Sequence, residues 1–129
     1  MDLGLRERCL QSVLIEYTVR MQLSDVYFIV IESPFRVERE GESISLSPED
    51  DPDEAFAPVR ELVGQKVIEA ISDNAGGLRV TFENGAHLVV DSDPAYEAWS
   101  VSGPDGALVV STPGGKLAVW SAKPSDNEQ

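Results

Sequence analysis

The stretch LRVTFENGAHLVV, residues 78–90, indicates the fold class most directly. Apolar and polar side chains alternate in its first five residues, and a second apolar run ends it. Alternation with period two is typical of a strand with one buried face. Asn84-Gly85 lies between the two runs and is the strongest two-residue signal for a hairpin. We therefore expect a type I′ hairpin here, in which Leu88 and Val90 face the same layer as Val80 and Phe82.

The same pattern occurs near the N-terminus. Residues 13–23 alternate cleanly, but eleven residues are long for one strand, so we expect a bend or break near Glu16–Thr18. A polar turn at Ser24-Asp25 and an apolar run over 27–31 follow. Because 5–31 and 62–90 share the order of their apolar positions and the place of their turn, the sequence indicates a duplicated strand–turn–strand unit.

The remaining segments also favour strands. Turn residues at Glu40-Gly41, at 103–106 and at 112–115 separate short apolar runs. These patterns predict a mainly β fold, α+β at its borderline, with about eight or nine short antiparallel strands in a sandwich or an open, curled barrel. One short helix is expected near 52–63, with Asp51 as its N-cap, and Pro58 should shorten it or divide it in two.

Length and net charge limit the classes of function that the protein can have. The chain has 129 residues, which fits a single globular domain over 1–120 followed by a flexible tail over 121–129. Its net charge of −13 argues against nucleic acid and anionic membranes as partners, since both require a basic surface. No signal peptide or membrane-spanning run is visible, and there is a single cysteine, so we expect a cytoplasmic protein.

The C-terminal residues carry a resemblance to a known family. They read DPAYEAWSVSGPDG over 93–106 and PGGKLAVW over 113–120. This signature resembles that of small bacterial proteins, mostly actinobacterial, which form a domain-of-unknown-function family. The resemblance implies a bacterial, cytoplasmic, single-domain protein and no particular activity. The family pattern has a glycine where this chain has Val26.

Motifs for catalysis are absent from the sequence, so an enzyme is disfavoured. The only histidine, His87, has no nucleophile paired with it at motif level, and the acidic runs lack the spacing of a calcium loop. We therefore predict no catalytic residue, no metal and no cofactor. His87, Tyr96 and Trp99 are the candidates for a ligand pocket, although the aromatic residues Trp99 and Trp120 are interpreted first as core residues.

Acidic side chains give the main functional hypothesis. Glu49, Asp50, Asp51, Asp53 and Glu54 are five carboxylates within six residues. We interpret them as a candidate interaction surface for a basic protein, as in an immunity or inhibitor role, because opposite charge speeds association. A plain solubilising surface is the alternative for this segment, and a small-molecule-binding β-fold is the alternative for the protein.

Overall fold

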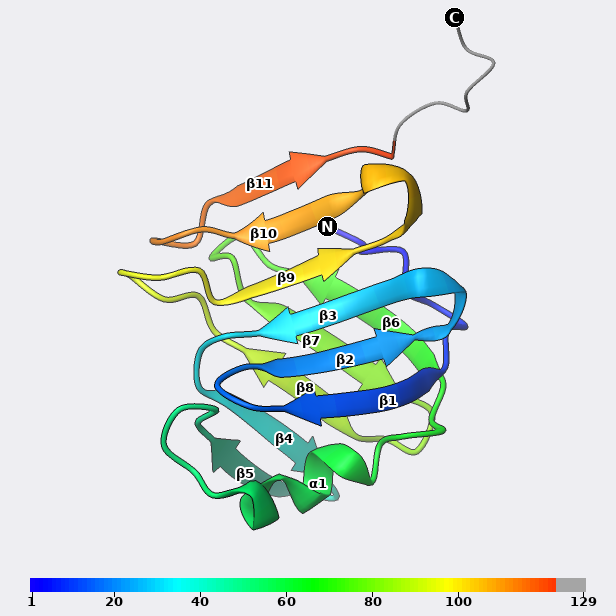
Figure 1. Ribbon diagram of the computed structural model, residues 1–129, viewed down its shortest axis with the longest axis vertical. Helices are drawn as coiled ribbons and strands as arrows, with labels where there is room; N and C mark the ends of the chain where they lie inside the picture. The colour runs from blue at the N-terminus through cyan, green and yellow to red at the C-terminus, as the bar shows by residue number, and fades with distance from the viewer. Residues whose placement is uncertain (123–129) are drawn as a thin grey trace, which may run out of the picture.

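The computed structural model describes residues 1–122, which form two antiparallel β-sheets packed face to face (Figure 1). The first sheet has six strands in the order β1-β2-β3-β9-β10-β11. Its strands are β1 (Leu10–Ile15), β2 (Val19–Leu23), β3 (Tyr27–Ile31), β9 (Trp99–Ser102), β10 (Leu108–Ser111) and β11 (Leu117–Trp120). The mainly β prediction is confirmed, and of the two architectures expected these residues form the sandwich.

The second sheet has five strands in the order β5-β4-β8-β7-β6. Its strands are β4 (Phe35–Arg39), β5 (Glu42–Leu46), β6 (Val67–Ser72), β7 (Leu78–Phe82) and β8 (His87–Val90). The described strands outnumber the eight or nine expected. The expected tail, 121–129, lies outside the described residues from position 123 onward.

The order of the strands reveals two similar halves. β1-β2-β3 and β6-β7-β8 are both three-stranded meanders, and the first pairing of each contains a register shift. After each meander the chain crosses to the other sheet: β4 pairs with β8, and β9 pairs with β3. The duplicated unit expected from the sequence therefore corresponds to two meanders that exchange their following strands.

The core lies between the two sheets. The inward side chains of β2 and β3 face those of β7 and β8 and are almost completely buried: Val19, Met21, Leu23, Ile29, Ile31, Leu78, Val80, Phe82, Leu88 and Val90. The predicted common layer for the 78–90 hairpin is thus confirmed. Removing these apolar side chains from water is the main favourable term for folding.

The long alternating segment 13–23 is broken in the structure. Ile15 pairs with Val19, and the N–H of Glu16 donates to the carbonyl of Thr18 at 3.0 Å. β1 and β2 are therefore joined by a tight turn that exposes Tyr17, where a break was expected. Alternation persists through a hairpin of this kind, so the pattern alone does not distinguish one strand from two.

The type I′ prediction for Asn84-Gly85 is wrong. The N–H of Phe82 donates to the carbonyl of Ala86, which leaves a three-residue loop of Glu83, Asn84 and Gly85. Only Gly85 of these has a positive φ, +90°. A type I′ turn has two central residues of positive φ, and that geometry occurs at Glu40-Gly41 instead, between β4 and β5.

The corresponding turn of the first meander carries backbone strain. Leu23 pairs with Tyr27, so Ser24, Asp25 and Val26 form the three-residue loop. Val26 is the third loop residue, as Gly85 is in the second meander, and its φ is +66°. A β-branched residue rarely adopts this conformation. A glycine at this position would suit the backbone better than Val26 does.

The helical segment is divided in two, as expected. A 3₁₀ turn, η2 (Asp53–Phe56), precedes α1 (Ala57–Arg60), and Pro58 lies in the first turn of α1, where its missing N–H costs nothing. Asp51 is not the N-cap that was predicted. Its carboxylate accepts a hydrogen bond from the N–H of Ser47 at 2.6 Å and closes the preceding turn instead.

The two tryptophans have different environments. Trp99 is fully buried, and its indole Nε1 donates to the carbonyl of Gly76 at 2.9 Å. The Ser111 hydroxyl donates to the same carbonyl at 2.8 Å, so one turn of the second sheet is joined to two strands of the first. A Cβ on Gly76 would lie 2.1 Å from the carbonyl oxygen of Gly115, so these two turns approach backbone to backbone.

Trp120 contradicts the prediction of a second core tryptophan. It is 54% exposed, because it belongs to β11 at the edge of the first sheet and points away from the second. Its neighbour Val119 is 51% exposed. The core prediction holds for Trp99 only.

We expect truncation of the two tryptophans to differ in cost. Trp99→Ala should lower the free energy of unfolding by about 3–5 kcal/mol, because it leaves a cavity. Trp120→Ala should lower it by less than about 1 kcal/mol in dilute protein, because half of this side chain already contacts water. Urea denaturation of both variants measures the difference, and equal losses would contradict the assignment.

A reciprocal exchange tests the two loop positions. Val26→Gly should raise the free energy of unfolding by about 0.5–1 kcal/mol, because relief of left-handed strain outweighs the added entropy of the unfolded chain. Gly85→Val should lower it by about 1–2 kcal/mol or more. Space is not the cause, since nothing lies within 4 Å of a Cβ at Gly85. Changes of the same sign in both variants, measured by denaturant unfolding, would disprove the equivalence.

Candidate functional site

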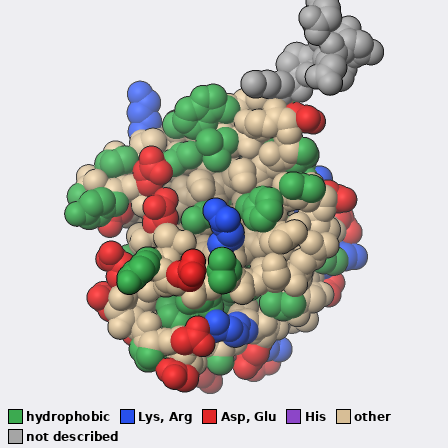
Figure 2. All heavy atoms as spheres, in the orientation of Figure 1, with side chains coloured by type: hydrophobic (Ala, Val, Ile, Leu, Met, Phe, Trp, Pro, Cys, Tyr) green, Lys and Arg blue, Asp and Glu red, His purple; other side chains and the backbone are tan. Residues whose placement is uncertain are grey.

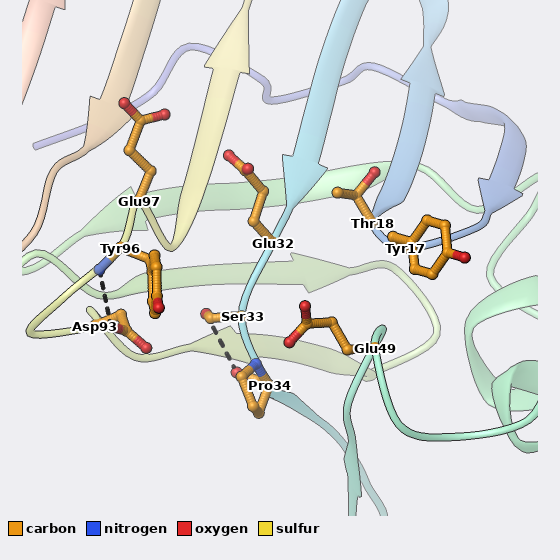
Figure 3. Close-up of a pocket in the computed structure, with 9 residues that line it drawn as sticks. All are labelled: Tyr17, Thr18, Glu32, Ser33, Pro34, Glu49, Asp93, Tyr96 and Glu97. Atoms are coloured by element: carbon orange, nitrogen blue, oxygen red, sulfur yellow. Dashed lines mark hydrogen bonds between the residues drawn. The ribbon is translucent and has the colours of Figure 1, made fainter.

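A groove of about 620 Å³ lies beside the two crossings between the sheets (Figure 3). Four connections contribute to it: the β1–β2 turn, the β3–β4 crossing, the β5–η2 loop and the β8–β9 crossing. Its lining residues are Tyr17, Thr18, Glu32, Ser33, Pro34, Glu49, Asp93, Tyr96 and Glu97. The groove therefore combines residues from both halves of the chain.

Backbone hydrogen bonds hold the two crossings side by side. The N–H of Glu32 donates to the carbonyl of Ala98 at 2.9 Å, and the N–H of Ser33 donates to the same carbonyl at 3.3 Å. In the second crossing, the Asp93 carboxylate accepts from the N–H groups of Ala95 and Tyr96 at 2.8 and 3.0 Å. Asp93 thus fixes the loop that presents Tyr96, so the groove has a defined backbone frame.

Carboxylates dominate the groove. Glu32, Glu49, Asp93 and Glu97 line it, no lysine or arginine does, and none of the four forms an ion pair within residues 1–122. In Figure 3 the side chains of Glu32 and Glu97 point the same way. Partial burial raises the pKa of Glu32 above its ordinary value, and the like charge of Glu97 raises it further. The groove is therefore a site of uncompensated negative charge.

Two tyrosines flank these carboxylates. Tyr17 is 81% exposed and Tyr96 is 73% exposed. Figure 3 shows them at opposite ends of the groove, with Glu32 and Glu49 between them. A tyrosine ring presents a face of negative potential that attracts cations. Aromatic faces and carboxylates thus favour the same kind of ligand.

The predicted acidic segment contributes one residue to the groove. Glu49 lines it, whereas the other described carboxylates of the segment have local roles or lie elsewhere. Asp50 accepts a hydrogen bond from the Ser47 hydroxyl at 3.1 Å, and Asp53 pairs with Arg60 at 2.8 Å. Glu54 is exposed in η2. Three of the five side chains therefore stabilise the loop and helix, Asp51 included.

The three candidate pocket residues are not brought together. Tyr96 lines the acidic groove, while Trp99 is enclosed in the core. His87 lies on β8, where its Nδ1 is 2.9 Å from the Thr81 hydroxyl, and it lines a separate shallow hollow beside the β4–β5 turn. Within residues 1–122, no group of three or more His, Cys, Asp and Glu side chains is placed to hold a metal ion.

Among the charged and aromatic residues of the groove, sequence reasoning did not select Tyr17, Glu32, Asp93 or Glu97 as site residues. Glu32 and Glu97 are 65 positions apart in the chain, and each looks like an ordinary loop acid. The usable signals were the Asp93-Pro94 turn and a tyrosine, Tyr17, at the predicted break of an alternating segment. Neither signal shows which connections will lie next to each other in space, because that depends on the order of the strands in the sheets.

The chain belongs to the family of unknown function DUF6188, whose model matches residues 1–121. This confirms the family type that the C-terminal signature indicated. No curated protein and no solved structure matches the chain, so the comparisons assign it no activity. None of the helices among the described residues is long and apolar enough to cross a bilayer.

The raised pKa of Glu32 predicts a pH-dependent contribution to stability. The folded protein binds this proton more readily than the unfolded chain, so the contribution of Glu32 becomes less favourable as pH rises from about 4.5 to the raised pKa. Glu32→Gln should therefore stabilise the protein at pH 7, by less than about 1 kcal/mol because solvent screens an exposed carboxylate. Below the ordinary pKa the gain should vanish.

The measurement is denaturant unfolding of both proteins at several pH values. Glu97→Gln is the informative companion, because it removes the like charge and should narrow the pH window in which Glu32→Gln matters. A gain from Glu32→Gln that does not change with pH would contradict this interpretation.

Proposed function

We propose that the protein is a non-catalytic binding protein whose groove receives a lysine- or arginine-rich segment of a basic protein. One observation carries the proposal: four carboxylates line the groove between two exposed tyrosines, without a lysine or arginine among the lining residues. An immunity or inhibitor role toward a basic protein is one form of this function.

Electrostatics supports a cationic ligand. Like charges that face one another raise the free energy of the unbound protein, and the raised pKa of Glu32 is a consequence of burial and of this repulsion. A bound ammonium or guanidinium group would relieve the repulsion. The net charge of −13 also attracts a basic partner over longer distances and speeds its association.

The shape of the site favours a segment of chain over a buried small molecule. Small-molecule sites are typically enclosed and mostly apolar. This groove is open to solvent, its acids come from three separate connections, and its tyrosines stand at opposite ends. An extended basic segment lying between Tyr17 and Tyr96 could contact several carboxylates at once.

A small organic cation is the second candidate ligand. The tyrosine pair favours it, since aromatic faces bind quaternary ammonium groups. We place either form of binding in a bacterial cytoplasm, supported by the single cysteine, Cys9, and by the family signature.

A hexalysine peptide tests the proposal. Titration calorimetry should detect binding that weakens steeply as salt is added, because exposed charges are screened. The double variant Glu49→Gln/Glu97→Gln should weaken this binding by about three- to tenfold. The matched control, Glu54→Gln/Glu61→Gln, removes the same charge outside the groove and should weaken it by less than about twofold.

Equal losses in the two double variants would show that only net charge matters and would disprove the groove. A parallel titration with tetramethylammonium separates the candidates. Binding of this cation but not of the peptide, lost in Tyr17→Ala and Tyr96→Ala, would favour the small-molecule function.

A further inference from the structure

Strand β11 has outward-facing backbone groups along one side. The N–H of Thr112 donates to the carbonyl of Lys116, so Lys116, Ala118 and Trp120 direct their polar backbone groups toward β10. Leu117 and Val119 therefore direct theirs to the opposite side. Within residues 1–122, β11 has no strand partner other than β10.

The β9–β10 pairing gives the same result independently. The N–H of Gly103 donates to the carbonyl of Ala107 at 3.0 Å, which orients alternate residues of β10 toward β9. The residues between them, including Leu108 and Val110, face β11 and pair with Trp120 and Ala118. The outward direction of Leu117 and Val119 thus rests on two sets of hydrogen bonds.

Two other sheet edges are covered at least in part by the chain itself. At β6, the N–H of Leu3 donates to the carbonyl of Ala70, and the N–H of Ser72 donates to that of Met1, both at 2.9 Å. At β1, only the first residue is covered within the described chain, since Leu10 exchanges hydrogen bonds with the backbone of Gly64 and Gln65, and Leu14 further along the strand is exposed. Proteins commonly cover edge strands in this way, because open edges recruit other strands.

The remaining two edges differ in charge. β5 begins at the exposed Glu42, just after Glu40-Gly41, and acids at an edge oppose pairing with another acidic chain. The hollow of about 270 Å³ beside β11 has no charged side chain in its lining. Figure 2 shows hydrophobic side chains over the upper part of the first sheet, where β10 and β11 lie, with acidic side chains lower on this face and along its rim.

We propose that β11 pairs antiparallel with β11 of a second copy, which joins two six-stranded sheets into one. A second copy carries the same charge of −13 and is repelled by the acidic surface elsewhere. The β11 edge carries no acidic side chain, only Lys116 and the apolar run 117–120, and with exposed Val119 and Trp120 it is the surface on which two such chains can meet.

The direction of the backbone groups fixes the register. The outward residues must form the hydrogen-bonded pairs, and the register that pairs the whole strand places Leu117 opposite Val119 of the second copy. Ala118 then lies opposite Ala118 of the second copy, on the two-fold axis. This is a close, non-hydrogen-bonded pair, which suits a small side chain. Lys116 lies opposite Trp120 of the second copy, where an ammonium group can contact an aromatic ring.

Sedimentation equilibrium of the full chain tests the pairing. The mass should rise with concentration from 14.0 kDa to about 28 kDa, twice the mass of one chain. Val119→Pro removes an outward N–H and should weaken dimerisation by at least about tenfold, because two of the four new hydrogen bonds are lost. The control Val119→Ile keeps this N–H and should dimerise like the parent protein.

A cross-link tests the register and does not depend on the proline variant folding. In a Cys9→Ser background, Ala118→Cys should form a disulfide-linked dimer on mild oxidation, because the paired Cα atoms would be about 4.5 Å apart. A chain of 14.0 kDa at every concentration would overturn the proposal. So would a dimer that Val119→Pro leaves intact and Ala118→Cys does not cross-link. This dimer does not depend on the proposed function, since the two sites share no lining residue.

Discussion

The fold depends on two adjacent crossings between the sheets. The carbonyl of Ala98, in the second crossing, accepts the N–H groups of Glu32 and Ser33 in the first. Each meander of one half is thereby completed by strands of the other, because β4 joins β8 and β9 joins β3. Neither half could form its sheet alone, so the core closes only when both crossings are in place. The groove lies where these connections meet, so the same hydrogen bonds position its lining residues.

This arrangement explains which features the sequence predicted. Alternation over 78–90 and 13–31 reports which side of a strand is buried, and that information is local. The mainly β fold and the divided helix at Pro58 could therefore be predicted, whereas the choice between a sandwich and an open barrel could not. The order of strands is not local: whether β11 lies at an edge depends on pairings far along the chain. Trp120 ends an apolar run, 117–120, that looks like a core strand, and yet it is exposed because β11 lies at an edge.

The candidate site was less predictable than the fold, because connections have no periodicity. Glu49 and Tyr96 were selected for charge and aromatic character, and both line the groove. Glu32 and Glu97 become neighbours in the groove only because the N–H of Glu32 donates to the carbonyl of Ala98, which follows Glu97 in the chain. The type of turn was also hard to predict from the dipeptide alone. Asn84-Gly85 and Glu40-Gly41 are similar dipeptides, but the residues on either side of them pair differently. Loop length, set by the register, decided which became type I′.

The charge of the chain affects the acidic groove and the β11 edge in opposite ways. A cation binding among Glu32, Glu49 and their neighbours reduces repulsion, so added salt weakens that contact. Two copies meeting at β11 bring two charges of −13 together, so added salt should strengthen that contact. The uncharged lining at β11 is what makes self-association compatible with so acidic a chain. A two-fold dimer also leaves both grooves open, and a long basic partner that spans them would gain affinity from the second site. An acidic surface thus restricts where a second copy can bind while it widens the range from which a basic partner is attracted.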